Sequence, residues 1–279
     1  MIEPHRARGR EWLFAAVSLA LAAAIAFFLG FTFWSVLLIA ILIACPVVIV
    51  WTYFMGQRPL PIPLGRTPET RGDTRYFDWV APWYAFHCSL FGLGKRFRNW
   101  MLALARAELR SGDRVLDVGC GNGVLTHPLA DIVGPTGEAW GIDPAPDMIR
   151  AAMQATCPAG NIAHFKLAAI EELPFPDTSF DAALISLVLH HLPPDLKVVG
   201  LREVHRVLKP GGRLLVIEPD RPDHWAWRIL VWPMRLYRNL RDHVDGKTPG
   251  LLQNAGFVSV RALGRWAHWL TFWIARKPA

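Results

Sequence analysis

The stretch Val115-Leu116-Asp117-Val118-Gly119-Cys120-Gly121-Asn122-Gly123 passes from an apolar run into a glycine-rich turn. A strand followed by glycines brings the backbone close to a ligand, and the next helix begins with its amide groups facing that ligand. The dinucleotide fingerprint is G-x-G-x-x-G, whereas the glycines here follow G-x-G-x-G. About twenty residues further on, Gly141-Ile142-Asp143 provides a carboxylate suited to ribose hydroxyls. The stretch therefore predicts a nucleoside ligand and fits NAD poorly.

Strand and helix signals alternate from residue 113 onward, which is typical of a doubly wound α/β sheet. The predicted strands are 114–118, 139–142, 180–186, 213–217, 258–263 and 269–275. Period-2 alternation in the last of these favours an antiparallel partner. Residues 221–250 interrupt the alternation with tryptophans and arginines, and predict an amphipathic insert.

The N-terminal part of the chain has no charged residue from Trp12 to Gly56. This length is enough for two membrane spans of roughly 20 residues each, so we expect a helical hairpin with helices at 12–29 and 33–55. A cleavable signal peptide is the alternative, but its apolar region usually covers only ~7–15 residues. Arginines flank the hairpin on both sides, so the positive-inside rule predicts a two-helix membrane protein with both termini and the remaining chain in the cytoplasm.

The whole chain divides into three parts where its composition changes. We expect a hairpin at 1–56, a linker and amphipathic helices at 57–110, and an α/β domain at 111–279. The net charge of +7 is not arranged as a basic run interleaved with aromatics, so no nucleic-acid partner is predicted. Scattered arginines beside an anchor favour anionic lipid headgroups instead. Four cysteines without C-x-x-C spacing indicate neither a metal site nor a disulfide framework.

Four segments in order carry a family resemblance, namely VLDVGCGNG, GIDPAPDMI, LPFPDTSFDAALISLVLHHL and LKPGGRLLVIEP, within residues 115–219. Together they resemble the class I S-adenosylmethionine-dependent methyltransferases. Upstream, FDWVAPWYAFHCSLFGLGKRFRNW is similar to the ubiquinone/menaquinone C-methyltransferases. The resemblance implies a Rossmann-like sheet of seven strands, a methyltransferase activity and S-adenosylmethionine as cofactor.

The resemblance also implies the cofactor-binding residues. Asp117 would face the methionine amino group, Asp143 the ribose diol and Met148 the adenine. The complete predicted set is Asp117, Gly119, Cys120, Gly121, Gly123, Asp143, Pro144, Met148, Ile170, Glu171 and Ser186. The position where such sequences usually offer an Asp to the adenine amino group is Ala169 here. Adenine would then rest on the Ile170 amide and apolar packing, or meet Glu171.

Methyl transfer from a sulfonium is an in-line displacement that depends on alignment and needs no metal. A carbon or oxygen acceptor also needs a base, and the segments after the fourth and fifth strands are where one can meet it. The predicted catalytic residues are His190, His191 and Glu218, with Asp220 and His243 as further candidates. Adjacent helical residues point about 100° apart, so at most one of the two histidines faces the pocket, and a polar strand-end cap is the alternative role.

Glu203 and Arg206 are expected to form only a surface ion pair.

For the whole protein the sequence leaves two hypotheses open. In the first, the enzyme methylates a lipophilic acceptor from the membrane: an isoprenoid quinol, a phospholipid amine, or a small hydrophobic thiol or phenol. In the second, a tethered module binds the cofactor or a lipid without turnover. The oligomeric state stays open.

Overall fold

The computed structural model describes Phe77 and residues 88–89, 92–155 and 163–279. The expected hairpin and the linker after it lie outside these residues. Among the helices that are described, none is both long and apolar enough to cross a membrane.

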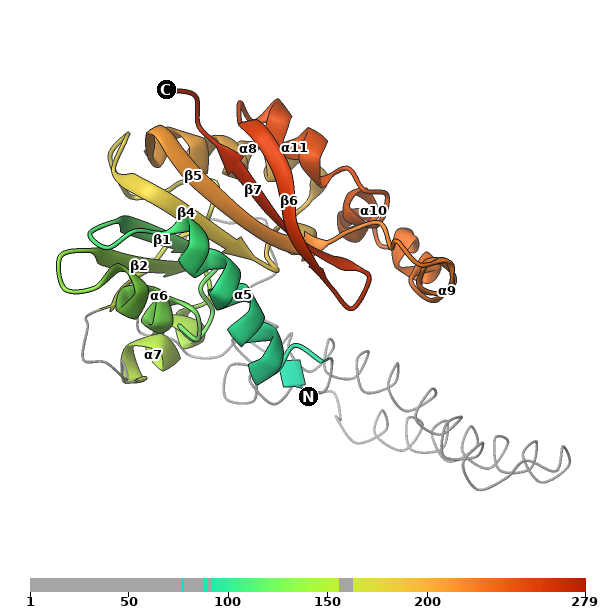
Figure 1. Ribbon diagram of the computed structural model, residues 1–279, viewed down its shortest axis with the longest axis horizontal. Coiled ribbons are helices and arrows are strands. Elements are labelled where there is room, and N and C mark those ends of the chain that lie inside the picture. Colours follow the sequence, from blue (N-terminus) through green and yellow to red (C-terminus); the bar gives the residue numbers. More distant parts are fainter. Residues whose placement is uncertain (1–76, 78–87, 90–91, 156–162) are drawn as a thin grey trace, which may run out of the picture. The chain divides into compact units, whose positions relative to one another are not determined.

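A seven-stranded sheet forms the centre of the described chain, with the strand order β3-β2-β1-β4-β5-β7-β6 (Figure 1). Strands β1 to β5 pair in parallel, while β7 runs antiparallel to both β5 and β6. The seven-stranded sheet expected from the resemblance is therefore present, and so is the antiparallel last strand. The strands are β1 Arg114–Val118, β2 Glu138–Asp143, β3 Ala163–Leu167, β4 Phe180–Ser186, β5 Leu208–Pro219, β6 Val258–Trp266 and β7 Leu270–Arg276.

Helices cover both faces of the sheet (Figure 1). One hydrophobic core holds Leu116 and Val118 of β1 together with Leu201 of α8, and the opposite core holds Val115 with Phe97 of α5. Successive residues of β1 thus point to opposite faces, as a strand buried on both sides requires. The helices outside the insert are α5 Lys95–Glu108, α6 Thr126–Val133, α7 Pro146–Gln154, η2 Leu189–His191, α8 Pro194–Val207 and α11 Thr248–Asn254.

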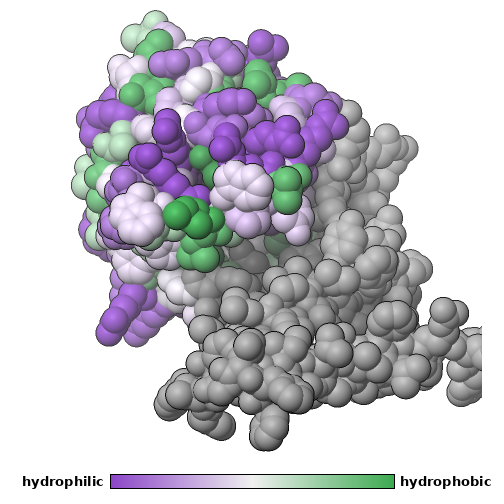
Figure 2. Space-filling view, turned by 90° about the vertical axis from the view of Figure 1, so that its right-hand side faces the viewer, coloured by the Kyte–Doolittle hydropathy of each residue, from purple (hydrophilic) through white to green (hydrophobic). Residues whose placement is uncertain are grey.

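The predicted insert forms three short helices, α9 Trp225–Leu230, η3 Trp232–Leu236 and α10 Arg238–Val244. They lie on the side of the described α/β domain that Figure 2 faces, where green and pale side chains stand among purple ones. The insert is attached to the turn after β4, because Asn239 Nδ2 of α10 donates to the carbonyl of His191 at 3.1 Å.

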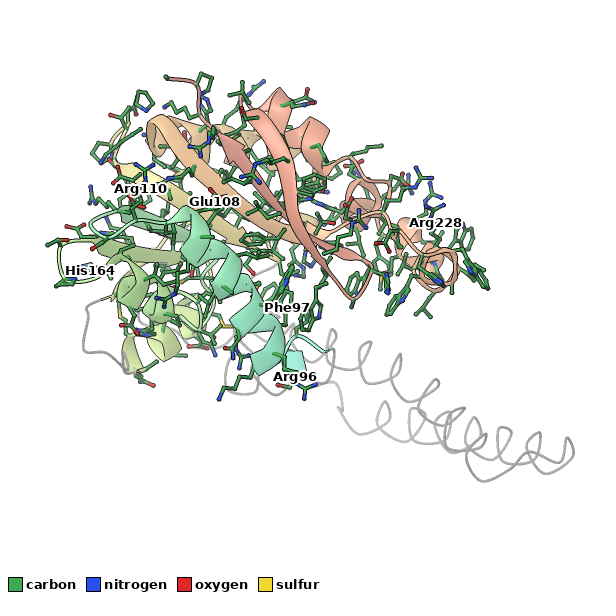
Figure 3. All side chains as sticks on the ribbon, in the orientation of Figure 1. Arg96, Phe97, Glu108, Arg110, His164 and Arg228 are labelled. Atoms are coloured by element: carbon green, nitrogen blue, oxygen red, sulfur yellow. The ribbon has the colours of Figure 1, made fainter. Side chains whose placement is uncertain are left out.

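Residues 92–94 interrupt the amphipathic helices expected within 57–110. Gly92 adopts a positive φ of 73°, and α5 begins only at Lys95. Figure 3 labels Arg96 and Phe97 on this helix; Arg96 is exposed and Phe97 is 1% exposed. The helix therefore packs on the sheet by one face, as an amphipathic helix does.

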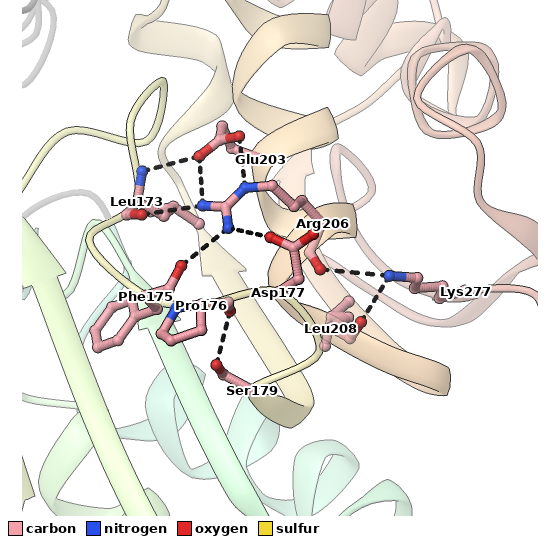
Figure 4. A network of polar contacts seen from close by, with 9 residues as sticks. All are labelled: Leu173, Phe175, Pro176, Asp177, Ser179, Glu203, Arg206, Leu208 and Lys277. Carbon is pink, nitrogen blue, oxygen red and sulfur yellow. Dashed lines mark hydrogen bonds and ion pairs between the residues drawn. The ribbon is translucent and has the colours of Figure 1, made fainter.

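The expected ion pair of Glu203 and Arg206 forms, but it is part of a larger network (Figure 4). The Arg206 guanidinium binds both Glu203 oxygens at 2.8 and 2.9 Å and also reaches Asp177 at 2.7 Å. It further donates to the carbonyl groups of Leu173 and Phe175. Arg206 thereby connects α8 to the loop at residues 173–177. The three-residue spacing of Glu203 and Arg206 predicts their own contact but not this contact with a loop.

Candidate active site

Two adjoining cavities open at the carboxyl ends of β1, β2 and β4. Strand order reverses between β1 and β4, which is where ligands bind in doubly wound sheets. The Asp143 cavity measures about 750 Å³ with its open mouth, and its lining includes Phe77, Asp143, Met148, Glu171 and His191. The Asp117 cavity measures about 580 Å³, and its lining includes Arg98, Asp117, Cys120 and Asn122. Both cavities are lined by Gly119, Gly121, Ser186 and Leu187.

The glycine-rich turn after β1 is fixed by hydrogen bonds that its amides donate to the end of β2. The amides of Gly119 and Cys120 both donate to the Ile142 carbonyl at 2.8 Å, and the Gly121 amide donates to Asp143 Oδ2 at 2.9 Å. Gly119 has a φ of +71°, and a Cβ there would stand 2.4 Å from Val188. No other residue fits this position, so the backbone forms the floor shared by the two cavities.

Asp117 is a buried carboxyl group at the end of β1, with an exposed fraction of 1%. Its Oδ2 accepts a hydrogen bond from Thr126 Oγ1 at 2.7 Å. Burial is the main cause that raises the pKa of Asp117 to about 7; the Thr126 hydroxyl opposes this rise and the charge of Asp143 adds to it. A positively charged ligand in the Asp117 cavity would stabilise the ionised form.

Asp143 has both carboxylate oxygens engaged with the backbone. Oδ1 accepts from the Ala145 amide at 2.9 Å, and Oδ2 accepts from Gly121. Each carboxylate oxygen can accept a second hydrogen bond, so the fixed carboxylate can still bind hydroxyl donors in its cavity.

Two buried oxygen atoms at the cavities have no hydrogen-bond partner among the described residues. They are Glu171 Oε2, on a residue of the Asp143 cavity, and Asn122 Oδ1, on a residue of the Asp117 cavity. An unsatisfied buried acceptor is costly, about 1–3 kcal/mol, and is rare in folded proteins. Each atom is thus a candidate acceptor for a donor group of a ligand.

Glu218, at the end of β5, fixes the turn after β4 by hydrogen bonds. Its Oε1 accepts from the amides of Val188 and Leu189 at 2.8 and 2.7 Å, and its Oε2 lies 2.7 Å from His190 Nδ1. Burial alone would raise the pKa of Glu218, but His190, the charge of His243 and the Leu189 amide outweigh burial and hold it at about 2. An ionised Glu218 is an acceptor only, so His190 donates its Nδ1 proton to it.

His191 is the histidine that lines the Asp143 cavity, whereas His190 does not. The residue is exposed, but its ring meets Phe77 edge-on at 5.0 Å and lies 4.0 Å from the His190 ring. Partial desolvation by these neighbours, followed by the charge of His190, lowers the pKa of His191. His191 therefore presents a neutral imidazole, which can accept a proton.

Comparison with known proteins identifies the family. A family model described as "Methyltransferase domain" matches residues 115–212. The ubiquinone/menaquinone biosynthesis C-methyltransferase UbiE of Burkholderia mallei is 34% identical over 206 residues, covering 66% of this chain and 84% of the relative. The enzyme of the same name from Burkholderia multivorans is 34% identical over 175 residues, covering 60% of this chain and 71% of the relative. This chain belongs to the class I S-adenosylmethionine-dependent methyltransferases.

Solved structures support the fold of this methyltransferase. The YcgJ protein of Bacillus subtilis matches with a TM-score of 0.51 and 23% identity, covering 65% of this chain and 99% of that chain. The [4+2]-cyclase SpnF matches with a TM-score of 0.55 and 21% identity, covering 74% of this chain and 96% of that chain. Because a cyclase shares the fold, the fold alone does not determine the reaction.

Nearly all of the predicted cofactor-binding residues line the two cavities. Ten of the eleven line one or both cavities, and the exception is Gly123. At Gly123 φ is +76°, and a Cβ would meet the Phe165 ring at 3.0 Å, so this glycine allows close packing below the turn. Cys120 lines the Asp117 cavity, but burial, followed by the charges of Asp117 and Asp143, raises its thiol pKa and keeps it neutral.

The predicted catalytic residues are brought together, but only His191 lines either the Asp143 cavity or the Asp117 cavity. His190 and Glu218 stand behind it as a hydrogen-bonded pair. Asp220 accepts from Arg265 and Thr271 at 2.8 and 2.7 Å, and His243 is buried with Nδ1 3.0 Å from Thr248 Oγ1. The order of the motifs predicted that these residues follow the ends of strands. It could not predict which side chains point into a cavity, because that depends on packing.

Sequence reasoning missed several cavity residues: Phe77, Arg98, Asn122, Leu187 and Val188. Asn122 lies inside the glycine motif, which was a usable signal. Phe77 and Arg98 come from segments upstream of the motif and reach the site only through folding. Leu187 adopts a φ of +58°, which is unusual for leucine, and its amide donates to Ile217 at 2.8 Å.

Proposed function

We propose that S-adenosylmethionine lies across the two cavities, with its adenosine part in the Asp143 cavity and its methionine part in the Asp117 cavity. Asp143 would hold the ribose diol, Met148 would pack on adenine, and Glu171 Oε2 would accept from the adenine amino group. The two unpartnered acceptors and the buried Asp117 carboxyl support this orientation, because the cofactor carries donors and a positive charge.

At the methionine end, Asp117 and Asn122 would receive the ammonium group. Arg98 of α5 lines the same cavity, and its guanidinium suits the cofactor carboxylate. Ala169 is buried and does not line the Asp143 cavity, so Glu171 takes the place of the usual aspartate at the adenine.

The acceptor is a lipophilic molecule drawn from a membrane, with the ring carbon of an isoprenoid quinol as the favoured target. The observation that supports it most is the apolar lining of the Asp143 cavity around His191, which comprises Phe77, Leu187, Val188 and Leu192. The relatives named above act in ubiquinone and menaquinone biosynthesis. An apolar lining binds a ring with a polyprenyl tail better than it binds a charged amine.

When bound, the cofactor supplies an electrophilic methyl group to the acceptor carbon. His191 accepts the proton that this carbon loses, because its imidazole is neutral and lines the cavity. Glu218 and His190 are positioning residues that hold the turn carrying His191. Leu187 and Phe77 exclude water from the same space.

The apolar stretch from Trp12 to Gly56 would form the two-helix membrane anchor, with both termini and the catalytic domain on the cytoplasmic side. Tethering to the bilayer gives the enzyme access to an acceptor that does not leave it. This location and the lipophilic acceptor are therefore two parts of one proposal.

Incubation of the purified full chain with methyl-labelled cofactor and a reduced membrane lipid extract tests the acceptor. We expect label in an extractable product whose mass matches a quinol gaining one methyl group. Label in a phospholipid, or in a small thiol or phenol, would replace the quinol. Cofactor binding with no labelled product would contradict the proposal.

Replacement of His191 tests the base. We expect His191→Gln to lower kcat about a hundredfold while leaving cofactor affinity unchanged. The matched control is His164→Gln, since His164 stacks on Trp140 at the far end of the sheet (Figure 3). An unchanged kcat in His191→Gln would remove His191 from the reaction.

A further inference from the structure

The insert exposes an unusual number of large apolar side chains. Six of them are between 58% and 72% exposed, and we call them the insert face: Trp225, Ile229, Leu230, Trp232, Leu236 and Tyr237. They stand on α9, on η3 and at the residue after it, so they share one short stretch of chain. Elsewhere in the described residues, large exposed hydrophobic residues occur singly, at Met153, Val199 and Val258. Clustered exposure of this kind indicates an interaction surface.

Arginines accompany the insert face. Residues 221–250 contain six Arg or Lys residues and three Asp residues, a net charge of +3. Three of these residues, Arg221, Arg228 and Arg235, line a groove of about 730 Å³ beside Trp232, which we call the arginine groove. An adjoining groove of about 830 Å³ shares Arg221 and Arg228 and adds Arg265. Figure 3 labels Arg228 at this end of the molecule.

The arginine groove is only partly neutralised by the protein. Arg235 pairs with Asp245 at 2.6 Å, and Arg265 pairs with Asp220 at 2.8 Å. Arg228 uses Nε to donate to the Pro222 carbonyl, which is a neutral acceptor. Exposed Arg221 and Arg238 make no ion pair with a described residue. Guanidinium groups with free donors favour phosphate, which they bind with two hydrogen bonds.

We propose that the insert face and the arginine groove dock the enzyme on the surface of an anionic phospholipid membrane. Tryptophan and tyrosine suit the boundary between headgroups and acyl chains, the aliphatic residues suit the acyl region, and the arginines suit the headgroup phosphates. A protein partner would require a shaped apolar surface, whereas α9 contributes no buried residue and five of its six residues are exposed. The combination of exposed aromatics with a net positive charge therefore selects a lipid surface as the occupant.

Docking would act on the catalytic site through α10. Asn239 of α10 donates to the carbonyl of His191, and the ring of His243 meets that of His190 edge-on at 6.4 Å. The segment that touches the bilayer is thus joined to the turn that lines the Asp143 cavity. This functional consequence rests on the proposed lipophilic acceptor, although docking itself does not.

Hydrogen exchange of the full chain in lipid nanodiscs tests the inference. One set of nanodiscs contains phosphatidylcholine alone, and the other contains phosphatidylcholine and phosphatidylglycerol in equal parts. We expect peptides from residues 225–241 to exchange about tenfold more slowly with phosphatidylglycerol, while peptides from β7 stay unchanged. Equal exchange in both sets would overturn the inference.

Exposed substitutions separate the two contributions. Trp225→Ser with Leu236→Ser should abolish the protection, and Arg221→Gln with Arg238→Gln should abolish its dependence on phosphatidylglycerol. The matched controls are Met153→Ser on α7 and Arg202→Gln on α8, which are also exposed but lie outside the insert. Protection that survives both double substitutions would overturn the inference.

Two further measurements exclude other occupants. Protection that inorganic phosphate produces in phosphatidylcholine nanodiscs would assign the groove to a soluble anion, and protection that depends on protein concentration in detergent would assign the face to a second copy of the chain. Methyl transfer to a short-chain quinol in detergent is measured in parallel. Transfer without lipid protection refutes docking alone, whereas protection without transfer refutes the proposed function alone.

Discussion

Asp117 combines complete burial with a position beside the expected ammonium group of the cofactor. In the free protein, burial raises the pKa of its carboxyl group from 3.8 to about 7. The protonated form is therefore favoured in the fold, and the stability that it contributes is lost as the pH rises through about 7. Binding of a cation reverses this preference, because it favours the ionised form.

Cofactor affinity should consequently depend on pH. Below pH 7 the cofactor has to displace a proton from Asp117, so we expect the Kd to fall about fivefold between pH 6 and pH 7.5 and to rise again above about pH 8, where the amino group of the cofactor loses its own proton. In Asp117→Asn we expect weaker binding with a Kd that does not change over this range, and greater stability of the free protein at pH 8. Titration calorimetry at three pH values measures this, and a wild-type Kd independent of pH would refute the assignment.

Glu171 tests the adenine end of the site. Its buried Oε2 lacks a partner, so Glu171→Ala should remove one hydrogen bond to the cofactor and raise the Kd about tenfold. Glu172→Ala is the matched control, because Glu172 is adjacent, exposed and outside the cavity lining. Equal effects of the two substitutions on the Kd would show that Glu171 makes no contact with the ligand.

The motif predicted Asp117, Asp143 and the shared glycines because one continuous stretch and the next strand end carry them. The same reasoning could not distinguish His190 from His191, since both follow β4 and only packing around Glu218 turns one ring toward the cavity. Glu218 was expected to be catalytic because it follows the strand predicted at 213–217. In the structure it is fully buried and binds the Val188 and Leu189 amides instead.

Among the elements, the turn after β4 depends most on contacts from other strands. Leu187 holds a positive φ there, and its amide and the next two are all bonded to the end of β5. A strained residue persists only where its surroundings fix it. The carboxyl end of β5 therefore shapes both cavities without lining them.

The loop before β4 is held in a similar way by Arg206 of α8. We expect Arg206→Gln to lower the free energy of unfolding by about 2 kcal/mol, because it removes charge-assisted bonds to Glu203 and Asp177 and leaves two carbonyl groups without their donor. Thermal unfolding measures this, with Arg202→Gln as the exposed control on the same helix. A loss no larger than that of the control would mean that the network (Figure 4) contributes little.

Strands were predictable where apolar residues are consecutive. The predicted and observed bounds of β1 and β4 are the same, 114–118 and 180–186. Both strands are buried on two faces, so their apolar residues are consecutive. Strand β3 was missed, since it is a sheet edge that carries His164 and Lys166 and has no fully buried residue. Strand β5 begins earlier than predicted: its pairing with β4 passes from Leu208 directly to Arg213, so residues 209–212 bulge out within the strand.

For the whole described chain, the order of the strands accounts for the site. Strands β1, β2 and β4 end at one edge, where the order reverses, and this edge places the two buried carboxyl groups in adjoining cavities. The insert after β5 joins the same edge to an exposed face rich in aromatic and arginine side chains. The proposed cofactor site and the proposed lipid-facing surface are thus joined by one short helix, α10.

The most direct test is a structure of the full chain with S-adenosylhomocysteine bound. We predict a ligand that spans both cavities, with its ribose hydroxyls on Asp143, its adenine amino group on Glu171 and its ammonium group on Asp117. A ligand that leaves either cavity empty, or that binds in the reverse direction with adenine beside Asp117, would contradict the account.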